Sequence, residues 1–224
     1  MNIEAKGLTK VYGEGENKII ALNNVNLEIV SGDFISIMGP SGSGKSTLLH
    51  LISGLDRPTS GNLTYDGKDI YSCSDKELSA FRRQRIGFIF QQFNLLPVLT
   101  AKENIIMPLL LDKKRHDETY LKKLTDLLGI SDRLTHLPNE LSGGQQQRVT
   151  IARAMIAQPD IIFADEPTGN LDSKSGGEVM EMLRDIWRNM KKALVIITHD
   201  NRIAQMADRQ FVIVDGILSE VTAR

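Results

Sequence analysis

The chain has 224 residues, of which 41% are hydrophobic and 25% are charged, and its formal net charge at pH 7 is -1. A chain of this length buries about 70–75% of its unfolded surface, so one globular domain can form without disulfides or metals. The balanced charge excludes a general electrostatic attraction to nucleic acid or anionic lipid, and we expect no nucleic-acid partner.

Neither the N-terminus nor the apolar runs are typical of a secreted or membrane-spanning protein. Residues 1–4 lack the basic start and apolar stretch of a signal peptide. The strongest apolar run, residues 105–111, contains Pro108 and is far shorter than the ~18 residues that span a bilayer. The single cysteine, Cys73, has no partner for an intramolecular disulfide, which suits a reducing compartment. We therefore expect a cytosolic or peripheral protein.

The first sixty-odd residues are typical of β-strands and their turns. Alternating or continuous apolar residues predict strands over residues 19–22, 25–29, 34–38 and 62–65. A loop is predicted at residues 13–17, and a tight turn at residues 66–67. The glycine-rich turn after the third strand leads into a helix over residues 46–53, which Gly54 ends.

The middle of the chain changes to charged helical stretches. Helices are predicted over residues 75–85 and 117–128, on either side of Pro97 and Pro108. No linker brackets this region, which favours a mostly helical insertion over a separate domain.

A second series of strands and helices follows the insertion. Residues 143–157 form a predicted helix that Pro159 ends, and an apolar stripe with helical spacing follows further along. That stripe is typical of a core-facing helix and consists of Val179, Met182, Leu183, Ile186, Trp187 and Met190. Short apolar runs predict buried strands over residues 161–164 and 194–197, and residues 211–218 predict a closing hairpin.

Polar side chains follow four of the apolar runs at the point where each run ends. These junctions are Met38–Gly39, Phe90–Gln91, Ala164–Asp165 and Ile197–Thr198. Ligands of open α/β sheets bind outside the carboxyl ends of the strands. We therefore predict that three of these runs are core strands, that the glutamine run lies nearby, and that one site collects all four.

A phosphate loop is the first motif at this edge. Glycines let several backbone N–H groups point inward, and the following helix presents its positive end to the phosphates. We expect Lys45 to reach the β- and γ-phosphates and Ser46 to ligate Mg²⁺. The alternative is a glycine-rich turn that merely precedes a helix, which the strand–turn–helix context disfavours. The predicted nucleotide-binding residues are Gly39, Pro40, Ser41, Gly42, Ser43, Gly44, Lys45, Ser46 and Thr47.

Two adjacent carboxylates follow the apolar run at residues 161–164. Asp165 can hold the magnesium through water, and Glu166 can polarise an attacking water. An acidic turn that closes a buried strand is the alternative for either residue alone. The pairing with a phosphate loop favours the catalytic interpretation.

The segment Leu-Ser-Gly-Gly-Gln opens the helix predicted from residue 143. Ser142 and Gln145 can form an ordinary capping box, and that interpretation is physically complete. However, Gly143 and Gly144 in the first helical turn cost about 1 kcal/mol each relative to alanine. Bare N–H groups at a positive helix end are what a close phosphate contact needs.

Together these motifs resemble the ATP-binding cassette (ABC) ATPases in order and rough spacing, over essentially the whole chain. The pentapeptide at residues 141–145 is the most specific element. The resemblance implies an α/β phosphate-loop NTPase with a mainly parallel core sheet, an N-terminal antiparallel β subdomain and an inserted helical subdomain. It implies one domain over residues 1–224, with a core of about 1–74 and 158–224 and a helical insertion of about 75–157 that carries the signature.

The resemblance also implies roles for residues outside the phosphate loop. Tyr12 would stack on adenine, although alone it is an ordinary strand aromatic. Gln91 would contact the magnesium and the attacking water and sense a membrane partner. His199 would contact the γ-phosphate, although a histidine capping a buried strand is the simpler interpretation. The implied catalytic residues are Glu166, His199, Gln91 and Lys45, and the implied metal-binding residues are Ser46, Gln91 and Asp165.

A second protomer is part of the implied mechanism. The signature residues Ser142, Gly143, Gly144 and Gln145 would bind the γ-phosphate held by the other protomer. Asp172 would lie at the dimer interface. The segment before it reads Thr-Gly-Asn instead of the commoner Ser-Ala form, which leaves the aspartate in place.

The segments 82–97 and 164–172 resemble the lipoprotein-release, macrolide-export and antimicrobial-peptide-resistance subgroup. We expect the apolar cluster at residues 93–99 to form a groove for a helix of the membrane subunit, with local core as the alternative. A solvated helix face is the favoured interpretation of the arginines Arg82, Arg83 and Arg85.

The resemblance implies an ATPase subunit that uses ATP and Mg²⁺, forms a dimer with a second copy of itself and has no nucleic-acid partner. It implies that this dimer drives a separate membrane permease from the inner face of the cell membrane. An ATPase that gates an extracytoplasmic enzyme through its membrane partner remains an alternative. A phosphate-loop kinase would have no use for residues 141–145, and cassettes of DNA repair or translation usually carry long coiled-coil inserts or tandem cassettes.

Overall fold

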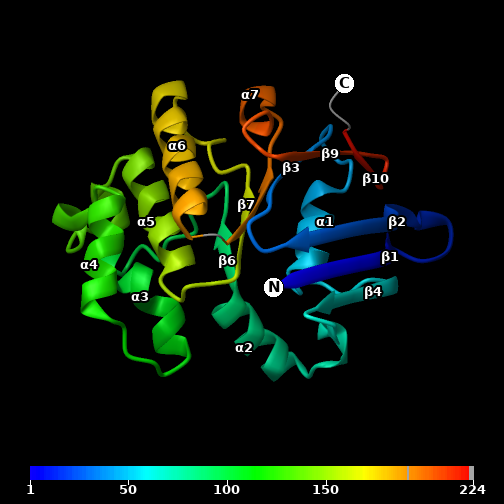
Figure 1. Cartoon of the computed structure of the whole chain (residues 1–224), viewed down its shortest axis with the longest axis horizontal. Coiled ribbons are helices and arrows are strands. Elements are labelled where there is room, and N and C mark those ends of the chain that lie inside the picture. Colours follow the sequence, from blue (N-terminus) through cyan, green and yellow to red (C-terminus); the bar gives the residue numbers. More distant parts are fainter. Residues whose placement is uncertain (191, 222–224) are drawn as a thin grey trace.

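Two β-sheets organise the part of the chain that the computed structural model describes, residues 1–190 and 192–221 (Figure 1). The strands are β1 (Asn2–Tyr12), β2 (Ile19–Val30), β3 (Phe34–Met38), β4 (Ser60–Tyr65), β5 (Lys68–Asp69), β6 (Ile86–Ile89), β7 (Ile161–Asp165), β8 (Ala193–Ile197), β9 (Arg209–Val214) and β10 (Ile217–Glu220). The α-helices are α1 (Lys45–Ile52), α2 (Asp75–Arg85), α3 (Ala101–Leu111), α4 (Glu118–Leu127), α5 (Gly143–Met155), α6 (Ser173–Met190) and α7 (Asn201–Ala204).

The core sheet has the strand order β10-β9-β3-β8-β7-β6. Strands β9, β3, β8, β7 and β6 run parallel to one another, and β10 pairs antiparallel with β9 as the predicted closing hairpin. The buried strands are continuous apolar runs because helices cover both faces of a parallel sheet. Their carboxyl ends therefore meet at one edge, as predicted.

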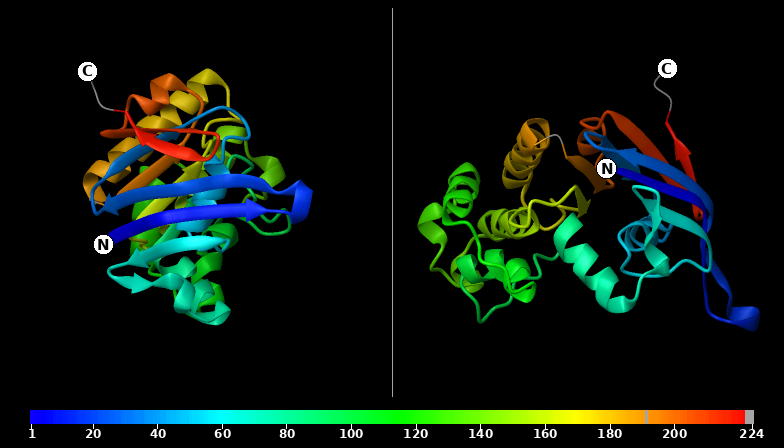
Figure 2. Two further views of the ribbon diagram at one scale, coloured as in Figure 1. Left: turned by 90° about the vertical axis from the view of Figure 1, so that its right-hand side faces the viewer. Right: turned by 60° about the horizontal axis from the view of Figure 1, so that its bottom comes forward.

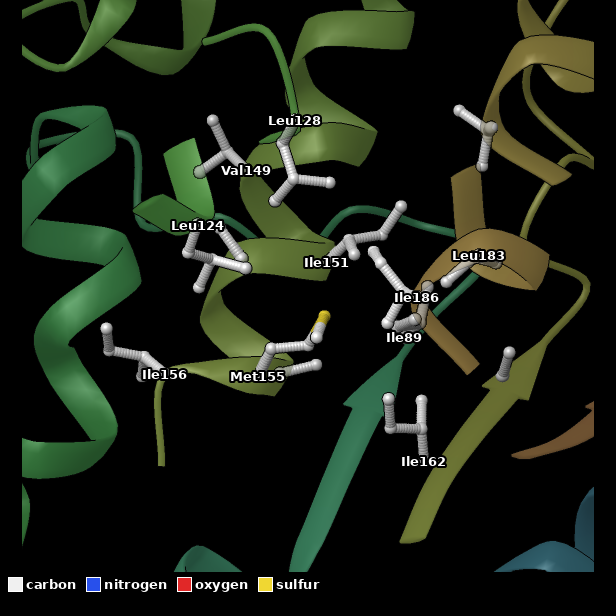
Figure 3. Close-up of a cluster of buried hydrophobic side chains, with 14 of the residues drawn as sticks. Ile89, Leu124, Leu128, Val149, Ile151, Met155, Ile156, Ile162, Leu183 and Ile186 are labelled. Atoms are coloured by element: carbon white, nitrogen blue, oxygen red, sulfur yellow. The ribbon is translucent and has the colours of Figure 1, made fainter. Parts of the chain in front are cut away.

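The helices pack on this sheet in two separate apolar clusters. Side chains alternate along β7, so Ile162 faces the cluster around α5 and Phe163 faces the cluster around α1. Figure 3 shows Ile162 converging with Ile151 and Met155 of α5 and with Leu183 of α6. Helices α1 and α5 consequently cover opposite faces of the sheet.

The N-terminal sheet is antiparallel, with the order β2-β1-β4-β5. The prediction of two separate strands over residues 19–22 and 25–29 was wrong, since β2 is continuous. Asn24 takes a left-handed φ of 51°, and the β1–β2 register shifts around it. A bulge of this kind absorbs a polar Asn-Asn pair without ending the strand. The turn at Asp66 and Gly67 is confirmed, with φ of 51° and 79°.

The glutamine run is itself a core strand, which corrects the prediction that it only lies near the sheet. Strand β6 is the edge strand and pairs parallel with β7. It lies inside the range assigned to the helical insertion, because four residues including Gly87 give little strand pattern. A Cβ at Gly87 would lie 2.7 Å from the carbonyl oxygen of Ala154, so the glycine allows α5 to approach the strand closely.

Helices α3, α4 and α5 lie together on one side of the core sheet, and the antiparallel sheet lies on the other (Figures 1 and 2). The predicted helices over residues 46–53, 75–85, 117–128 and 143–157 match α1, α2, α4 and α5 to within two residues at each end. Within residues 1–190 and 192–221, none of the helices combines the length and apolarity needed to cross a bilayer.

The three arginines of α2 do not form a solvated face, contrary to the prediction. Arg82 donates to the carbonyl of Gly54 at 2.7 Å, and Arg83 pairs with Asp112 at 2.6 Å. Arg85 pairs with Asp66 at 2.8 Å and also with Asp160. Each guanidinium therefore ties α2 to a different segment of the chain.

Candidate functional site

The phosphate loop has the backbone conformation that its glycines allow. Gly44 caps α1 with a φ of 107°, and a Cβ there would lie 2.4 Å from the carbonyl oxygen of Ala21. Only glycine fits both requirements. The Lys45 ammonium folds back over the loop and donates to the carbonyls of Gly39 and Pro40, each at 2.8 Å. The hydroxyl of Ser43 is buried and has no hydrogen-bond partner among the described atoms.

A cleft of about 480 Å³ lies in front of this loop. It brings together side chains from the carboxyl ends of β3, β7 and β6, as the sequence predicts. Strand β2 and the β9–β10 turn complete its walls. Its lining residues are Ile19, Ile20, Ala21, Ser41, Gly42, Gly44, Lys45, Ser46, Thr47, Gln91, Asp165, Glu166, Asp215 and Gly216.

The donors in the cleft fit a magnesium ion. The Ser46 hydroxyl lies 3.4 Å from Oδ2 of Asp165, so two oxygen donors face the same point. Burial raises the pKa of the Asp165 carboxyl, and the neighbouring Glu166 adds to that rise. A nearby cation would relieve this cost. The described residues contain no cluster of three or more His, Cys, Asp or Glu side chains.

Glu166 has a specific geometry beside this position. Its φ of 48° is unusual for a residue with a side chain. The conformation is fixed by its N–H, which donates to the carbonyl of Ile197 at 2.9 Å, and by its own carbonyl, which accepts from Gly169 at 2.9 Å. Oε2 of Glu166 lies 2.7 Å from Nδ1 of the exposed His199. The histidine is therefore placed at the carboxylate and does not cap the strand.

Gln91 also lines this cleft, two residues after the end of β6. Its carbonyl accepts a hydrogen bond from Asn170 at 2.8 Å. Its side chain packs on Gly169, where an added Cβ would lie 2.8 Å from Nε2. The departure from the commoner Ser-Ala form thus places a glycine where Gln91 needs room.

The signature turn, residues 142–145, lies outside the phosphate-loop cleft. Ser142 caps α5, and the capping box with Gln145 is complete, with distances of 2.9 and 3.3 Å. None of residues 142–145 lines the 480 Å³ cleft, because α5 and α1 cover opposite faces of the sheet. The structure therefore brings the phosphate loop, Gln91, Asp165 and Glu166 together in one chain, but not the signature.

Within the chain, no steric constraint requires glycine at positions 143 and 144 of the signature. Neither has a positive φ, and an added Cβ would meet Leu171 at 3.4 Å from Gly143, or Ser175 at 3.5 Å from Gly144. Both distances are ordinary van der Waals contacts. The capping box accounts for Ser142 and Gln145, but nothing described in the chain requires the two glycines.

Asp172 lies at the N-terminal end of α6. It accepts hydrogen bonds from the N–H groups of Lys174 and Ser175, each at 3.0 Å, and bonding to Ser175 lowers the pKa of its carboxyl. It lines a second hollow of about 370 Å³ that also contains Glu166 and His199. The segment between Glu166 and Asp172 thus separates two hollows that share one carboxylate.

Tyr12 lies at the end of β1, directly opposite Ile19 of β2, which lines the cleft. The residue is 42% exposed, and its hydroxyl donates to Oδ2 of Asp56 at 2.9 Å. Asp56 is 44 residues away in the sequence, and nothing in the local pattern identifies it.

Helix α5 holds the segments that follow Glu166 and Gln91 through residues that the sequence analysis missed. The fully buried Gln147 donates to the carbonyl of Pro167 at 2.7 Å, directly after Glu166. Arg153 donates to the carbonyls of Phe93 and Asn94 at 2.8 and 2.6 Å, just after Gln91. A polar residue on the buried face of a predicted helix was the available signal for Gln147.

Of the predicted docking cluster at residues 93–99, only Asn94 lines the groove found in this region. Leu95 packs on the core cluster, whereas Val98 is 81% exposed. This groove, of about 310 Å³, lies between α2, β6, α3 and α5. Its apolar lining consists of Leu55, Ile86, Phe88, Phe90, Met107, Pro108, Leu111, Ala154 and Ala157.

Comparisons with known proteins agree on one family. A sequence model of the ABC transporter family matches residues 22–169. An uncharacterized ABC transporter ATP-binding protein of Methanocaldococcus jannaschii is 50% identical over 224 residues, 98% of each chain. The lipoprotein-releasing system ATP-binding protein LolD of Geobacter metallireducens is 47% identical over 216 residues, 96% of each chain.

Two further matches extend this result. The macrolide export ATP-binding/permease protein MacB of Bdellovibrio bacteriovorus is 45% identical over 96% of this chain, which spans 33% of MacB. A solved dimeric ATP-binding cassette in a post-hydrolysis state, bound to ADP and Pi, superposes with a TM-score of 0.87 at 43% identity. That superposition covers 99% of this chain and 100% of the cassette.

Proposed function

Because this chain belongs to the ABC transporter ATPase family, we propose that two copies close face to face around two ATP molecules and thereby drive a separate membrane permease. The observation that carries this proposal is the separation of the signature turn from the phosphate-loop cleft. A second copy supplies what one chain lacks, since nothing described within the chain requires the half-buried glycines of the signature. The dimeric state of the similar cassette supports the same arrangement.

Each side chain in the cleft has a task that its position supports. Lys45, already turned toward the loop, neutralises the β- and γ-phosphates, and the Ser43 hydroxyl gains the polar partner that it lacks. Ser46, Asp165 and Gln91 hold Mg²⁺, which when bound supplies positive charge to the phosphate oxygens. Phosphoryl transfer of this kind depends mostly on positioning and charge stabilisation.

Glu166 acts as the general base. Its Oε2 takes the proton of the attacking water, and His199, bonded through Nδ1, orients that carboxylate. The other ring nitrogen of His199 would be left to contact the γ-phosphate. Asp172 and the segment before it lie at the interface, beside the hollow shared with Glu166.

We also propose the domain division. The chain forms one ABC ATPase domain, with the core from residues 1–74 and 158–224 and the helical insertion from residues 75–157. The pairing of β6 with β7 adds residues 86–89 to the core side of this division.

The permease docks in the apolar groove between α2, β6, α3 and α5. Apolar side chains line most of the groove, beside Arg82, Arg83, Asn94 and Arg153, and the lining residue Leu111 is 62% exposed. An amphipathic helix places its apolar side chains in such a groove. The groove lies next to Gln91, so binding of the permease in the groove is communicated to the nucleotide site through β6. The same contact holds the chain at the inner face of the membrane.

The names of LolD and MacB support a partner of the lipoprotein-release or macrolide-export type. An ATPase that gates an extracytoplasmic enzyme would use the same groove.

Affinity purification from detergent-solubilised membranes tests this docking site. We expect the wild-type chain to retain a multi-spanning protein, identified by mass spectrometry, and Leu111→Asp to lose it. Leu127→Asp is the matched control, because Leu127 is 53% exposed on α4, away from the groove. Thermal unfolding of both variants checks that they are folded. Equal retention by the two variants would exclude this groove as the docking site.

A further inference from the structure

A partly buried ion pair lies beside Tyr12, with the Lys10 side chain 13% exposed and the Asp56 side chain 33% exposed. Lys10 donates to Oδ1 of Asp56 at 2.8 Å and to the carbonyl of Arg57 at 2.7 Å. Asp56 Oδ1 also accepts from the N–H of Arg57 at 2.7 Å. These bonds fix the Asp56 carboxylate, which accepts the Tyr12 hydroxyl on its other oxygen at 2.9 Å. The phenol is therefore held by a carboxylate that is itself held from two sides.

Lys10 has a second contact with the same ring. Its ammonium lies 4.9 Å from the centroid of the Tyr12 ring, within the range of a cation–π interaction. The lysine side chain is only 13% exposed, so this contact is largely buried. One side of the ring is consequently directed to Lys10, and the exposed part of the ring is what remains for a ligand.

The ring stands beside the phosphate-loop cleft. Tyr12 is paired across the strands with Ile19, a lining residue, so the two side chains project from the same face of the sheet. Thr47, at the end of the phosphate loop, lines the same cleft. A ligand whose phosphates occupy the loop can therefore place a flat apolar group on Tyr12 and Ile19.

We propose that Asp56 and Lys10 are positioning residues for the base of the nucleotide: they fix the pose of the Tyr12 ring on which the base stacks. This inference rests on the proposed ATP site and adds two residues that touch no substrate. Charge-assisted hydrogen bonds such as Asp56–Tyr12 are stronger than neutral ones. Burial, followed by the hydrogen bond to Asp56, raises the pKa of the Tyr12 phenol, so the hydroxyl remains a donor at neutral pH.

The test compares two ligands, Mg-ATP and inorganic triphosphate, by calorimetry. Asp56→Ala and Tyr12→Phe are each expected to weaken Mg-ATP binding about three- to tenfold, the loss expected for one hydrogen bond. Inorganic triphosphate has no base, so its affinity should not change. The double variant should bind Mg-ATP no more weakly than the weaker single variant, because both changes break the same bond. In steady-state assays KM should rise while kcat stays constant.

Asp75→Ala is the matched control, since this carboxylate is 95% exposed and pairs with Arg57 at 3.2 Å on the other side of the same segment. If Asp56→Ala is poorly folded, Tyr12→Phe decides, because it keeps the whole Lys10–Asp56 pair. Unchanged Mg-ATP binding in both variants, or an equal loss for triphosphate, would overturn the inference. Failure of the wild-type chain to bind either ligand would instead overturn the ATP site itself.

Discussion

Glu166→Gln is expected to lower kcat for ATP hydrolysis by a factor of about 10²–10⁴ while leaving ATP binding intact. The amide has nearly the same shape as the carboxylate and keeps a hydrogen-bonding atom toward His199, which lies 2.7 Å from Oε2 in the wild-type chain. It cannot take a proton from water. The backbone at Glu166, with its φ of 48°, is held by bonds to Ile197 and Gly169 that do not involve the side chain.

The same variant should accumulate an ATP-bound dimer, because closure is driven by binding and reopening by hydrolysis. Single-turnover assays with labelled ATP measure the rate, and light scattering with and without ATP measures the dimer. Lys45→Ala provides the contrast, since it removes the ammonium from the loop and should lose both nucleotide binding and the dimer. Normal turnover by Glu166→Gln would show that another group is the base.

Gly144→Ala should increase the stability of the chain and still lower its ATPase activity. Alanine in the first turn of α5 is favoured over glycine by up to about 1 kcal/mol, and its Cβ would meet only Ser175 at an ordinary 3.5 Å. Activity should fall about 10- to 100-fold, because the methyl group obstructs N–H contacts to the γ-phosphate of the opposite site, and hydrogen bonds to charged groups contribute about 1.5–3 kcal/mol.

Ser142→Ala separates the two effects. It removes the cap of α5 and should destabilise the chain by about 1 kcal/mol, while also lowering activity. Urea unfolding and ATPase assays on both variants then give stability changes of opposite sign and activity changes of the same sign. If the Gly144→Ala variant hydrolysed ATP at the wild-type rate, the signature would have no part in the reaction.

The sequence predicts the parts of the fold that local pattern controls. The phosphate loop, the carboxylates after β7 and the capping box of α5 each depend on residues within ten positions of one another. Continuous apolar runs identify β3, β7 and β8, because parallel strands are buried on both faces. The start of α2 follows from the complete capping box of Ser74 and Glu77.

Contacts between distant segments were beyond such patterns. The pairing of β6 with β7 joins residues 75 positions apart. Gly87 in β6 is there because α5 approaches the strand closely, and it does not mark a loop. The Tyr12–Asp56 bond and the ion pair between Arg83 and Asp112 are likewise set by tertiary packing. The sequence alone does not show whether a charged residue such as Arg83 faces water or pairs with a residue 29 positions away.

The shared reaction centre is tested most directly by measuring specific ATPase activity against protein concentration, with sedimentation in parallel to give the monomer fraction. If each site needs the signature of a second chain, activity per molecule rises in proportion to concentration while monomers predominate, and levels off once dimers do. A constant activity per molecule across a range in which the chain stays monomeric would contradict the account.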